Sequence, residues 1–168
     1  MKQLDKAIQF ATKAHEGQTR KYTGEPYIVH PLAVMEIVKT VDHTEEMLMA
    51  AVLHDTVEDT DATIQDIDKE FGPIVAQLVE ELTDVSKPED GNRAFRKGLD
   101  RDHSAQASAQ GQTIKIADLI DNAKSITEHD EHFAKVYMKE KALLLQVLDK
   151  ADKILLKKAQ KKVDIWFS

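Results

Sequence analysis

The sequence predicts an all-α protein, folded as a single compact multi-helix bundle. Apolar residues recur at spacings of three and four along most of the 168 residues, and no stretch alternates apolar and polar residues long enough to indicate a strand. Glycine and proline gather in two segments, residues 17–31 and 86–93, which we expect to be the main loops. The chain can enclose one core and contains no repeat or linker, so one domain is expected.

Helices are expected wherever the apolar spacing persists between these loops. The first two flank the loop at residues 17–31, and the segment at 93–102 carries the weakest pattern. The apolar positions of the first two helices are Leu4, Ala7, Ile8, Ala11 and Ala14, and then Leu32, Met35, Ile37 and Val38. The further expected helices span residues 45–57, 64–71, 74–82, 93–102, 113–126, 132–148 and 151–163.

Composition excludes several classes of function. Cysteine is absent, so no disulfide, thiolate metal site or cysteine nucleophile can form, and imidazole and carboxylate must hold any metal. A formal net charge of −7 argues against nucleic acid as the main partner. The N-terminus lacks the pattern of a secretory signal, and no apolar run approaches a membrane span. We therefore expect a cytoplasmic protein without a membrane partner, and the sequence predicts no oligomeric state.

The most informative segment is HDTVEDT, residues 54–60, which follows the apolar run MLMAAVL. His54 and Asp55 are expected near the end of a buried helix, with Glu58 and Asp59 one turn further along roughly the same faces. An imidazole beside a carboxylate offers one nitrogen and one oxygen ligand to a divalent ion, whereas a buried carboxylate without a partner is costly. The alternative is an acidic helix end on the surface, with His54 bonded to a nearby carbonyl.

Two further segments favour a metal site. KIADLIDN, residues 115–122, places Asp118 and Asn122 on one face of an apolar helix, where a buried Asp118 needs a cation. His30 stands directly before Pro31, which favours an extended conformation at a helix entrance, and a backbone-bonded loop histidine is the alternative. The remaining histidines, expected to be surface or structural residues, are His15, His43, His103, His129 and His132.

The loop at residues 17–31 is dense in polar and basic side chains, as functional loops often are. Arg20 and Lys21 are its candidates for binding an anion. The alternative is that both are solvated after a helix end, where positive charge suits the helix dipole.

Four segments in this order resemble the hydrolase domain of the Rel/Spo alarmone enzymes, especially the small alarmone hydrolases of the HD-domain superfamily. They are AIQFATKAHEGQTRKYTGEPYIVHPLAV, AAVLHDTVEDT, FGPIVAQLVEELTDV and TIKIADLIDNAKSI. A His-Asp pair alone is weak evidence for this family. The motifs GEPYxxHP, HDxxED and KxADxxxN, with this order and spacing, are together specific for it. The resemblance covers nearly the whole chain and implies an HD-type phosphohydrolase domain over residues 1–168, with no synthetase domain.

The resemblance also implies a metal ion, usually manganese, with other divalent metals compatible, and a nucleotide substrate. The implied reaction is hydrolysis of the 3′-pyrophosphate of ppGpp-like nucleotides, which releases pyrophosphate. The implied residues are His30, His54, Asp55 and Asp118 for the metal, Glu58 and Asp59 for catalysis, and Arg20, Lys21 and Asn122 for the substrate. Residues in segments that line the pocket of relatives are Tyr27, Lys97, Lys135 and Tyr137.

Departures from the family pattern bear on the substrate. Leu119 and Lys124 stand where the long bifunctional relatives often have arginine, and Tyr22 and Thr23 replace a commoner small-residue pattern before Gly24. These changes leave the implied metal ligands intact. They concern recognition of the base, so whether guanine or adenine is preferred stays open.

Three rival functions are compatible with the same residues. The first is an HD-type phosphohydrolase that acts on another nucleotide, such as NADPH. The second is a nucleotide-binding sensor without turnover, which would have little need for both Glu58 and Asp59. The third is a purely structural helical protein, which would bury Asp55 and Asp118 without compensation.

Overall fold

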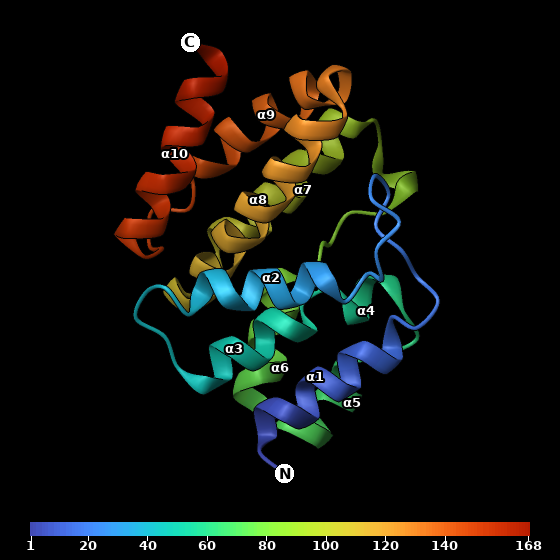
Figure 1. The fold of residues 1–168 in the computed structure, drawn as a ribbon. Helices are drawn as coiled ribbons and strands as arrows, with labels where there is room; N and C mark the ends of the chain where they lie inside the picture. The colour runs from blue at the N-terminus through green and yellow to red at the C-terminus, as the bar shows by residue number, and fades with distance from the viewer.

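The computed structural model describes residues 1–168 and confirms the predicted all-α class (Figure 1). It contains ten α-helices, one short 3₁₀ helix and no strand. The elements are α1 (Gln3–Ala14), α2 (Val29–Val38), α3 (Glu45–Leu53), α4 (Thr56–Asp59), α5 (Ile64–Phe71), α6 (Pro73–Leu82), the 3₁₀ helix η1 (Pro88–Asp90), α7 (Arg93–Ala105), α8 (Ala109–His129), α9 (Glu131–Leu145) and α10 (Lys153–Phe167).

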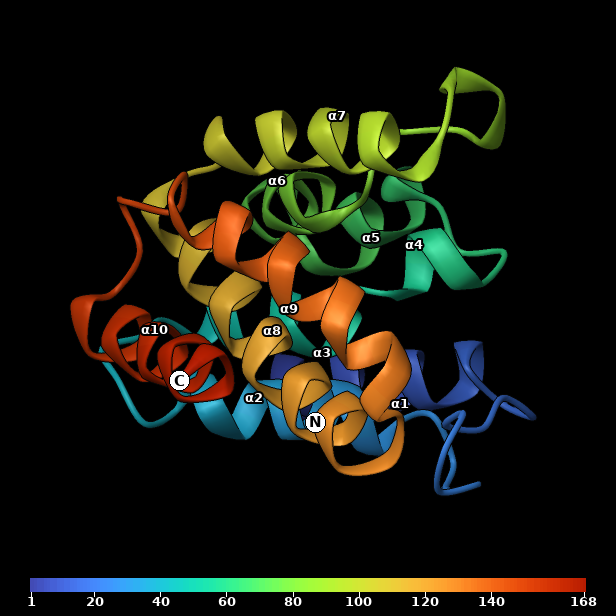
Figure 2. The same cartoon turned by 90° about the horizontal axis from the view of Figure 1, so that it is seen from above.

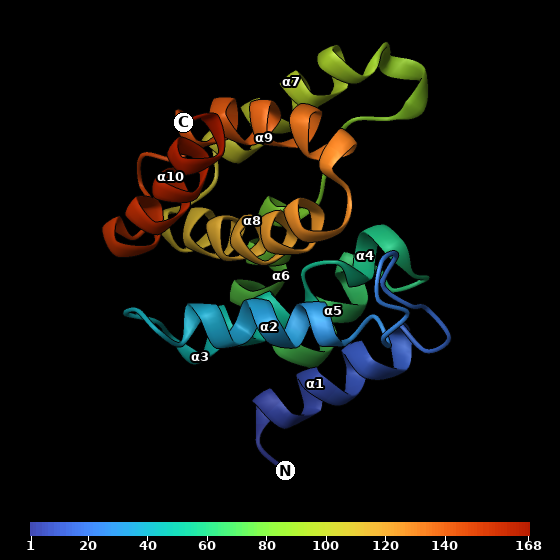
Figure 3. The ribbon, with the colours of Figure 1, turned by 45° about the horizontal axis from the view of Figure 1, so that its top comes forward.

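The helices form two groups that meet along α8. Helices α1 to α6 make one group, and α7, α9 and α10 lie on the other side of α8 (Figures 1 and 3). Helix α8 packs against α2, α3 and α6 on one side and against α9 and α10 on the other. The two chain ends lie at opposite ends of the molecule in Figure 1. None of the helices combines the length and apolar composition needed to cross a bilayer.

One hydrophobic cluster of 33 buried residues extends through both groups. Helix α3 is its centre, because every residue from Met47 to Leu53 is buried, as expected for a helix that is apolar on all sides. Helix α8 adds Ile114, Ile116 and Leu119 on its buried faces. The polar site lies beside this core, where the beginning of α2 and the turn after α3 approach the middle of α8.

Local sequence explains where several helices begin. The Thr44 hydroxyl accepts from the Met47 amide at the start of α3, and Thr63 and Asp66 form a reciprocal capping box at the start of α5. Gly72 separates α5 from α6 with a φ of 92°, a conformation that favours glycine, and Pro73 then opens α6. These local features fix where α3, α5 and α6 begin.

Two local predictions were wrong, and both concern the site. The helix expected over residues 45–57 breaks after Leu53, because the His54 imidazole donates to the Ala51 carbonyl and the Thr56 hydroxyl donates to the Leu53 carbonyl. His30 is not extended but lies in the first turn of α2, where the following Pro31 removes an amide that has no helical partner. Other helix ends differ by a few residues from those expected.

Candidate metal and substrate site

Four side chains from three parts of the chain converge on one point. His30 comes from the first turn of α2, His54 and Asp55 from the turn between α3 and α4, and Asp118 from the middle of α8. One nitrogen or oxygen from each residue lies within 4.8 Å of the others. Figure 3 shows the beginning of α2 and the short α4 on the same side of the molecule as the loop that follows α1. The structure thus brings together all four residues that the resemblance implied as metal ligands.

Hydrogen bonds orient both imidazoles of this cluster. The Nδ1 atom of His54 donates to the Ala51 carbonyl (2.6 Å), and the Nδ1 atom of His30 donates to the Asp121 carboxylate (2.6 Å). Both Nε2 atoms therefore face Asp118 Oδ1, at 2.8 Å from His30 and 3.2 Å from His54. With Nδ1 engaged in this way, Nε2 is the atom of each ring that is left to bind a metal.

A cavity of about 230 Å³ opens beside the cluster and includes His54, Asp55 and Asp118 in its wall. Its other polar lining residues are Tyr27, Glu58, Asp84, Lys97, Asp100, Arg101, Ser104, Lys115, Asn122, Tyr137, Glu140 and Lys141. Of the residues expected in the site, Glu58, Asn122, Tyr27, Lys97 and Tyr137 line the cavity.

Other expected residues lie outside this cavity. Arg20 pairs with Asp121 (2.9 Å), behind the metal cluster, and Lys21 is exposed with its ammonium 5.5 Å from the Tyr22 ring centre. Asp59 is exposed next to the cluster, and Lys135 lies in an adjoining groove between α7 and α9.

A family model described as "HD domain" matches residues 7–145 of the chain. This match spans α1 to α9, including the three segments that form the cluster. The chain belongs to the HD-domain family.

Relatives and solved structures agree with this family assignment and confirm the resemblance to Rel/Spo hydrolases. The HD domain is 41% identical over 122 residues to a Drosophila melanogaster protein named guanosine-3′,5′-bis(diphosphate) 3′-pyrophosphohydrolase MESH1, covering 71% of this chain and 66% of that protein. It is 51% identical over 87 residues to the Escherichia coli protein named bifunctional (p)ppGpp synthase/hydrolase SpoT, covering 52% of this chain and 12% of that protein. The chain thus spans less than two thirds of these relatives.

A solved structure matches nearly the whole chain. It is described as a metazoan ortholog of SpoT that hydrolyses ppGpp and plays a role in starvation responses. The TM-score is 0.86 with 30% sequence identity, covering 96% of this chain and 94% of that chain.

Charges within the HD domain explain why the cluster suits a cation. Burial alone would lower the pKa of His54, but the Asp55 and Asp118 carboxylates outweigh it and raise that pKa well above its usual value. Burial would raise the pKa of Asp118, but its bonds to His30 and His54 hold it well below its usual range. The carboxylates thus favour positive charge on the imidazoles, and the imidazoles favour negative charge on the carboxylates. Two imidazoles and two carboxylates form a mixed donor set that fits manganese, iron or zinc.

Glu58 stands at the rim of the cavity of the HD domain. Its carboxylate accepts from the Asp84 backbone amide (3.0 Å). Partial removal from water, together with repulsion from the Asp84 side chain, raises the pKa of Glu58 to about 8. Because the residue as a whole is exposed, solvent screens part of that repulsion.

Sequence reasoning missed most of the positive charge in the cavity. Lys97 was expected there, but Arg101, Lys115 and Lys141 were not. None of these four cations makes an ion pair with an acidic side chain. Burial lowers the pKa of Lys141 to about 8, and repulsion from Lys115 and Lys97 adds to the effect. Lys115 precedes Asp118 by three residues, so its helical spacing could have revealed it.

A carboxylate behind His30 was also missed. Asp121 bonds His30 Nδ1 and the Arg20 guanidinium, and these two partners hold its pKa below the usual value despite partial burial. It follows Asp118 by three residues, a helical spacing that places both near His30. Asp121 is thus positioned to orient an imidazole of the metal site without entering the cluster.

Replacing Asp121 by alanine is expected to weaken manganese binding by about 10- to 100-fold, because the His30 ring loses the partner that orients it. Equilibrium dialysis of the metal-stripped protein against manganese measures this effect. The control is Arg20→Ala, which removes the ion pair with Asp121 but keeps the Asp121–His30 bond. Equal loss in both variants would contradict an orienting role for Asp121.

Proposed function

We propose that this chain hydrolyses the 3′-pyrophosphate of an alarmone nucleotide, (p)ppGpp or (p)ppApp, and releases pyrophosphate. The observation that carries the proposal is a two-histidine, two-aspartate cluster at the wall of a cavity that also holds four cations without ion pairs. The names of the fly and bacterial relatives support the same substrate class. We place the activity in the cytoplasm, within a single HD-type domain over residues 1–168.

The proposed cofactor is manganese, held by His30, His54, Asp55 and Asp118. The donor set and the oriented Nε2 atoms support this choice over a magnesium site, since magnesium prefers oxygen ligands alone. When bound, such an ion supplies Lewis acidity toward a phosphoryl oxygen and lowers the pKa of water.

The remaining residues of the site are assigned by charge and position. Glu58, with a pKa raised to about 8, can give a proton to the ribose 3′ oxygen as water forms a bond to the 3′ phosphorus and the bond from that oxygen to phosphorus breaks. Asp59 is the second catalytic carboxylate, proposed to take the proton of the attacking water, and the Gln18 amide donates to its backbone carbonyl (2.9 Å). Asn122 lies beside Asp118, its amide donating to the carboxylate (3.1 Å), where it can meet the ribose.

The cations of the cavity are proposed to hold the phosphates. Lys97 and Lys115 repel Lys141, and a pyrophosphate group bound among these cations and Arg101 would offset that repulsion. Arg20 and Lys21 lie outside the cavity, on the loop at its edge, and are proposed to contact the base.

The decisive experiment is a substrate comparison. Metal-stripped protein reloaded with manganese is incubated separately with ppGpp, ppApp and NADPH, and the released pyrophosphate and orthophosphate are quantified. We expect pyrophosphate from at least one alarmone and no orthophosphate from NADPH. Orthophosphate from NADPH alone would instead establish an HD-type phosphohydrolase for another nucleotide. Nucleotide binding without any product would establish a sensor.

A further inference from the structure

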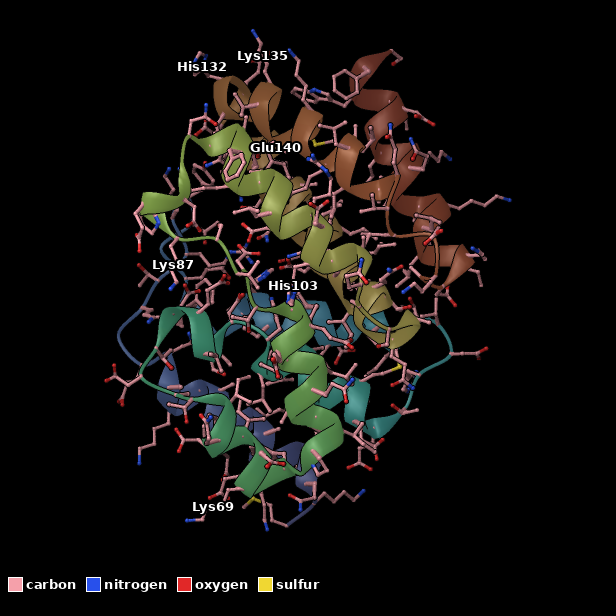
Figure 4. The ribbon with its side chains drawn as sticks, turned by 180° about the vertical axis from the view of Figure 1, so that it is seen from behind. Lys69, Lys87, His103, His132, Lys135 and Glu140 are labelled. Carbon is pink, nitrogen blue, oxygen red and sulfur yellow. The ribbon has the colours of Figure 1, made fainter.

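A second concavity of about 530 Å³ lies between α7 and α9, outside the cavity that contains the metal cluster. Helices α7 and α9 are on the same side of α8 (Figures 2 and 3). Figure 4 shows Lys135 and Glu140 along α9, with α7 toward the viewer. We call this concavity the α7–α9 groove, and its charged residues are Arg93, Lys97, Arg101, Lys135, Lys139 and Glu140.

The charge of the α7–α9 groove is opposite to that of the whole chain. The groove has five cationic residues and one acidic residue, although the chain carries a net charge of −7. The acid is already engaged, because Glu140 accepts two bonds from the Arg93 guanidinium, at 2.7 and 3.0 Å. The other four cations make no ion pair.

The positions of these four cations form two facing pairs. Lys97 and Arg101 are one turn apart on α7, and Lys135 and Lys139 are one turn apart on α9. Apolar side chains complete the walls, among them Val136, which is 44% exposed, and Leu143, which is 48% exposed. Walls of low polarity with charge of one sign concentrate the electric field, so the groove is built to attract an anion.

The α7–α9 groove continues the cavity of the metal cluster. Lys97, Arg101 and Glu140 line both. No proposed metal ligand lines the groove. A ligand that reacts at the metal cluster can therefore extend past these shared residues and place a second charged end in the groove.

We propose that the α7–α9 groove binds the 5′-phosphate chain of the nucleotide, an inference that rests on the proposed function. An alarmone has two anionic arms, and the 3′ arm is the one that must reach the metal cluster. The 5′ arm is then the arm free to meet Lys135 and Lys139. Each additional 5′ phosphate adds negative charge within the groove, so the pentaphosphate binds more tightly than the tetraphosphate.

The first test compares kcat and KM for pppGpp and ppGpp. We expect a lower KM for pppGpp in the parent protein, and about a tenfold rise of that KM in Lys135→Ala/Lys139→Ala, equivalent to about 1.4 kcal/mol. In the same double variant, the KM for ppGpp should rise less than the KM for pppGpp, and kcat for both substrates should stay at the parent value. The matched control is Lys157→Ala/Lys161→Ala, which removes two exposed lysines at the same spacing on α10. We call Lys135→Ala/Lys139→Ala the groove variant. If its ratio of the KM for pppGpp to the KM for ppGpp equals that of the parent protein, the proposal is overturned.

A binding series separates this proposal from the proposed function. Titration calorimetry with GMP, GDP and GTP at constant manganese needs no turnover. We expect affinity for the parent protein and the control to rise with the number of 5′ phosphates, and the rise to disappear in the groove variant. If neither alarmone releases pyrophosphate, the proposed function fails while this series still decides the role of the groove. A rise that persists in the groove variant would overturn the groove proposal alone.

Discussion

Replacing Glu58 by glutamine is expected to lower kcat for alarmone hydrolysis by about 10²- to 10⁴-fold, the usual contribution of a positioned acid or base. Glutamine keeps an acceptor oxygen for the Asp84 amide but cannot release a proton. Because Glu58 is not one of the four clustered side chains, manganese binding should stay at the parent level. Single-turnover rates and equilibrium dialysis measure the two effects. A variant that loses manganese as well would assign Glu58 to metal binding instead.

The pH dependence of the parent enzyme follows from the same residue. Glu58, with a pKa near 8, is protonated below that value, so a reaction that needs it as an acid slows as the pH rises through 8. Asp84→Asn removes the largest charge that raises this pKa and keeps the backbone amide bond to Glu58. The alkaline limb of the pH profile should therefore move to lower pH in Asp84→Asn. An alkaline limb that stays in place would indicate that another group controls it.

Much of the site could be predicted because its residues occur in short motifs. The segments around His54 and Asp118 each carry a polar residue within an apolar helical pattern, and His30 stands directly before Pro31 in the motif GEPYxxHP. Burial of such residues is costly without a partner, and the structure brings them within reach of one another. The local pattern marked these residues as candidates, and the resemblance to the Rel/Spo hydrolases joined them into one expected site.

Other features depend on tertiary packing and left no local signal. Lys141 lies in the ordinary amphipathic pattern of α9, and Asp84 lies in the segment between α6 and η1, yet both line the cavity. The break after Leu53 was missed because the apolar spacing continues to Val57 while side chains of the turn take the hydrogen bonds. The ion pair of Arg20 with Asp121, 101 residues away, likewise has no local signal in the sequence.

Replacing Asp118 by asparagine is expected to have the largest effect of any single change in the site. Its Oδ1 atom accepts from both clustered imidazoles and from the Asn122 amide, so no other carboxylate has the same position. Asparagine keeps the shape of the Asp118 side chain and removes its negative charge. We expect manganese affinity to fall by at least about 100-fold, and hydrolysis by about 10³-fold or more, since a catalytic metal is worth several kcal/mol.

Manganese dialysis between pH 6 and 8 tests the physical cause of this effect. In the parent protein Asp55 and Asp118 outweigh burial and raise the pKa of His54 well above its usual value, so metal must displace protons and affinity must increase with pH. Asp118→Asn removes part of that charge, so its affinity should be lower overall and depend less on pH. Asn122→Ala is the control, because it removes one bond to Asp118 without changing any charge. Parent-level affinity in Asp118→Asn would exclude Asp118 as a ligand.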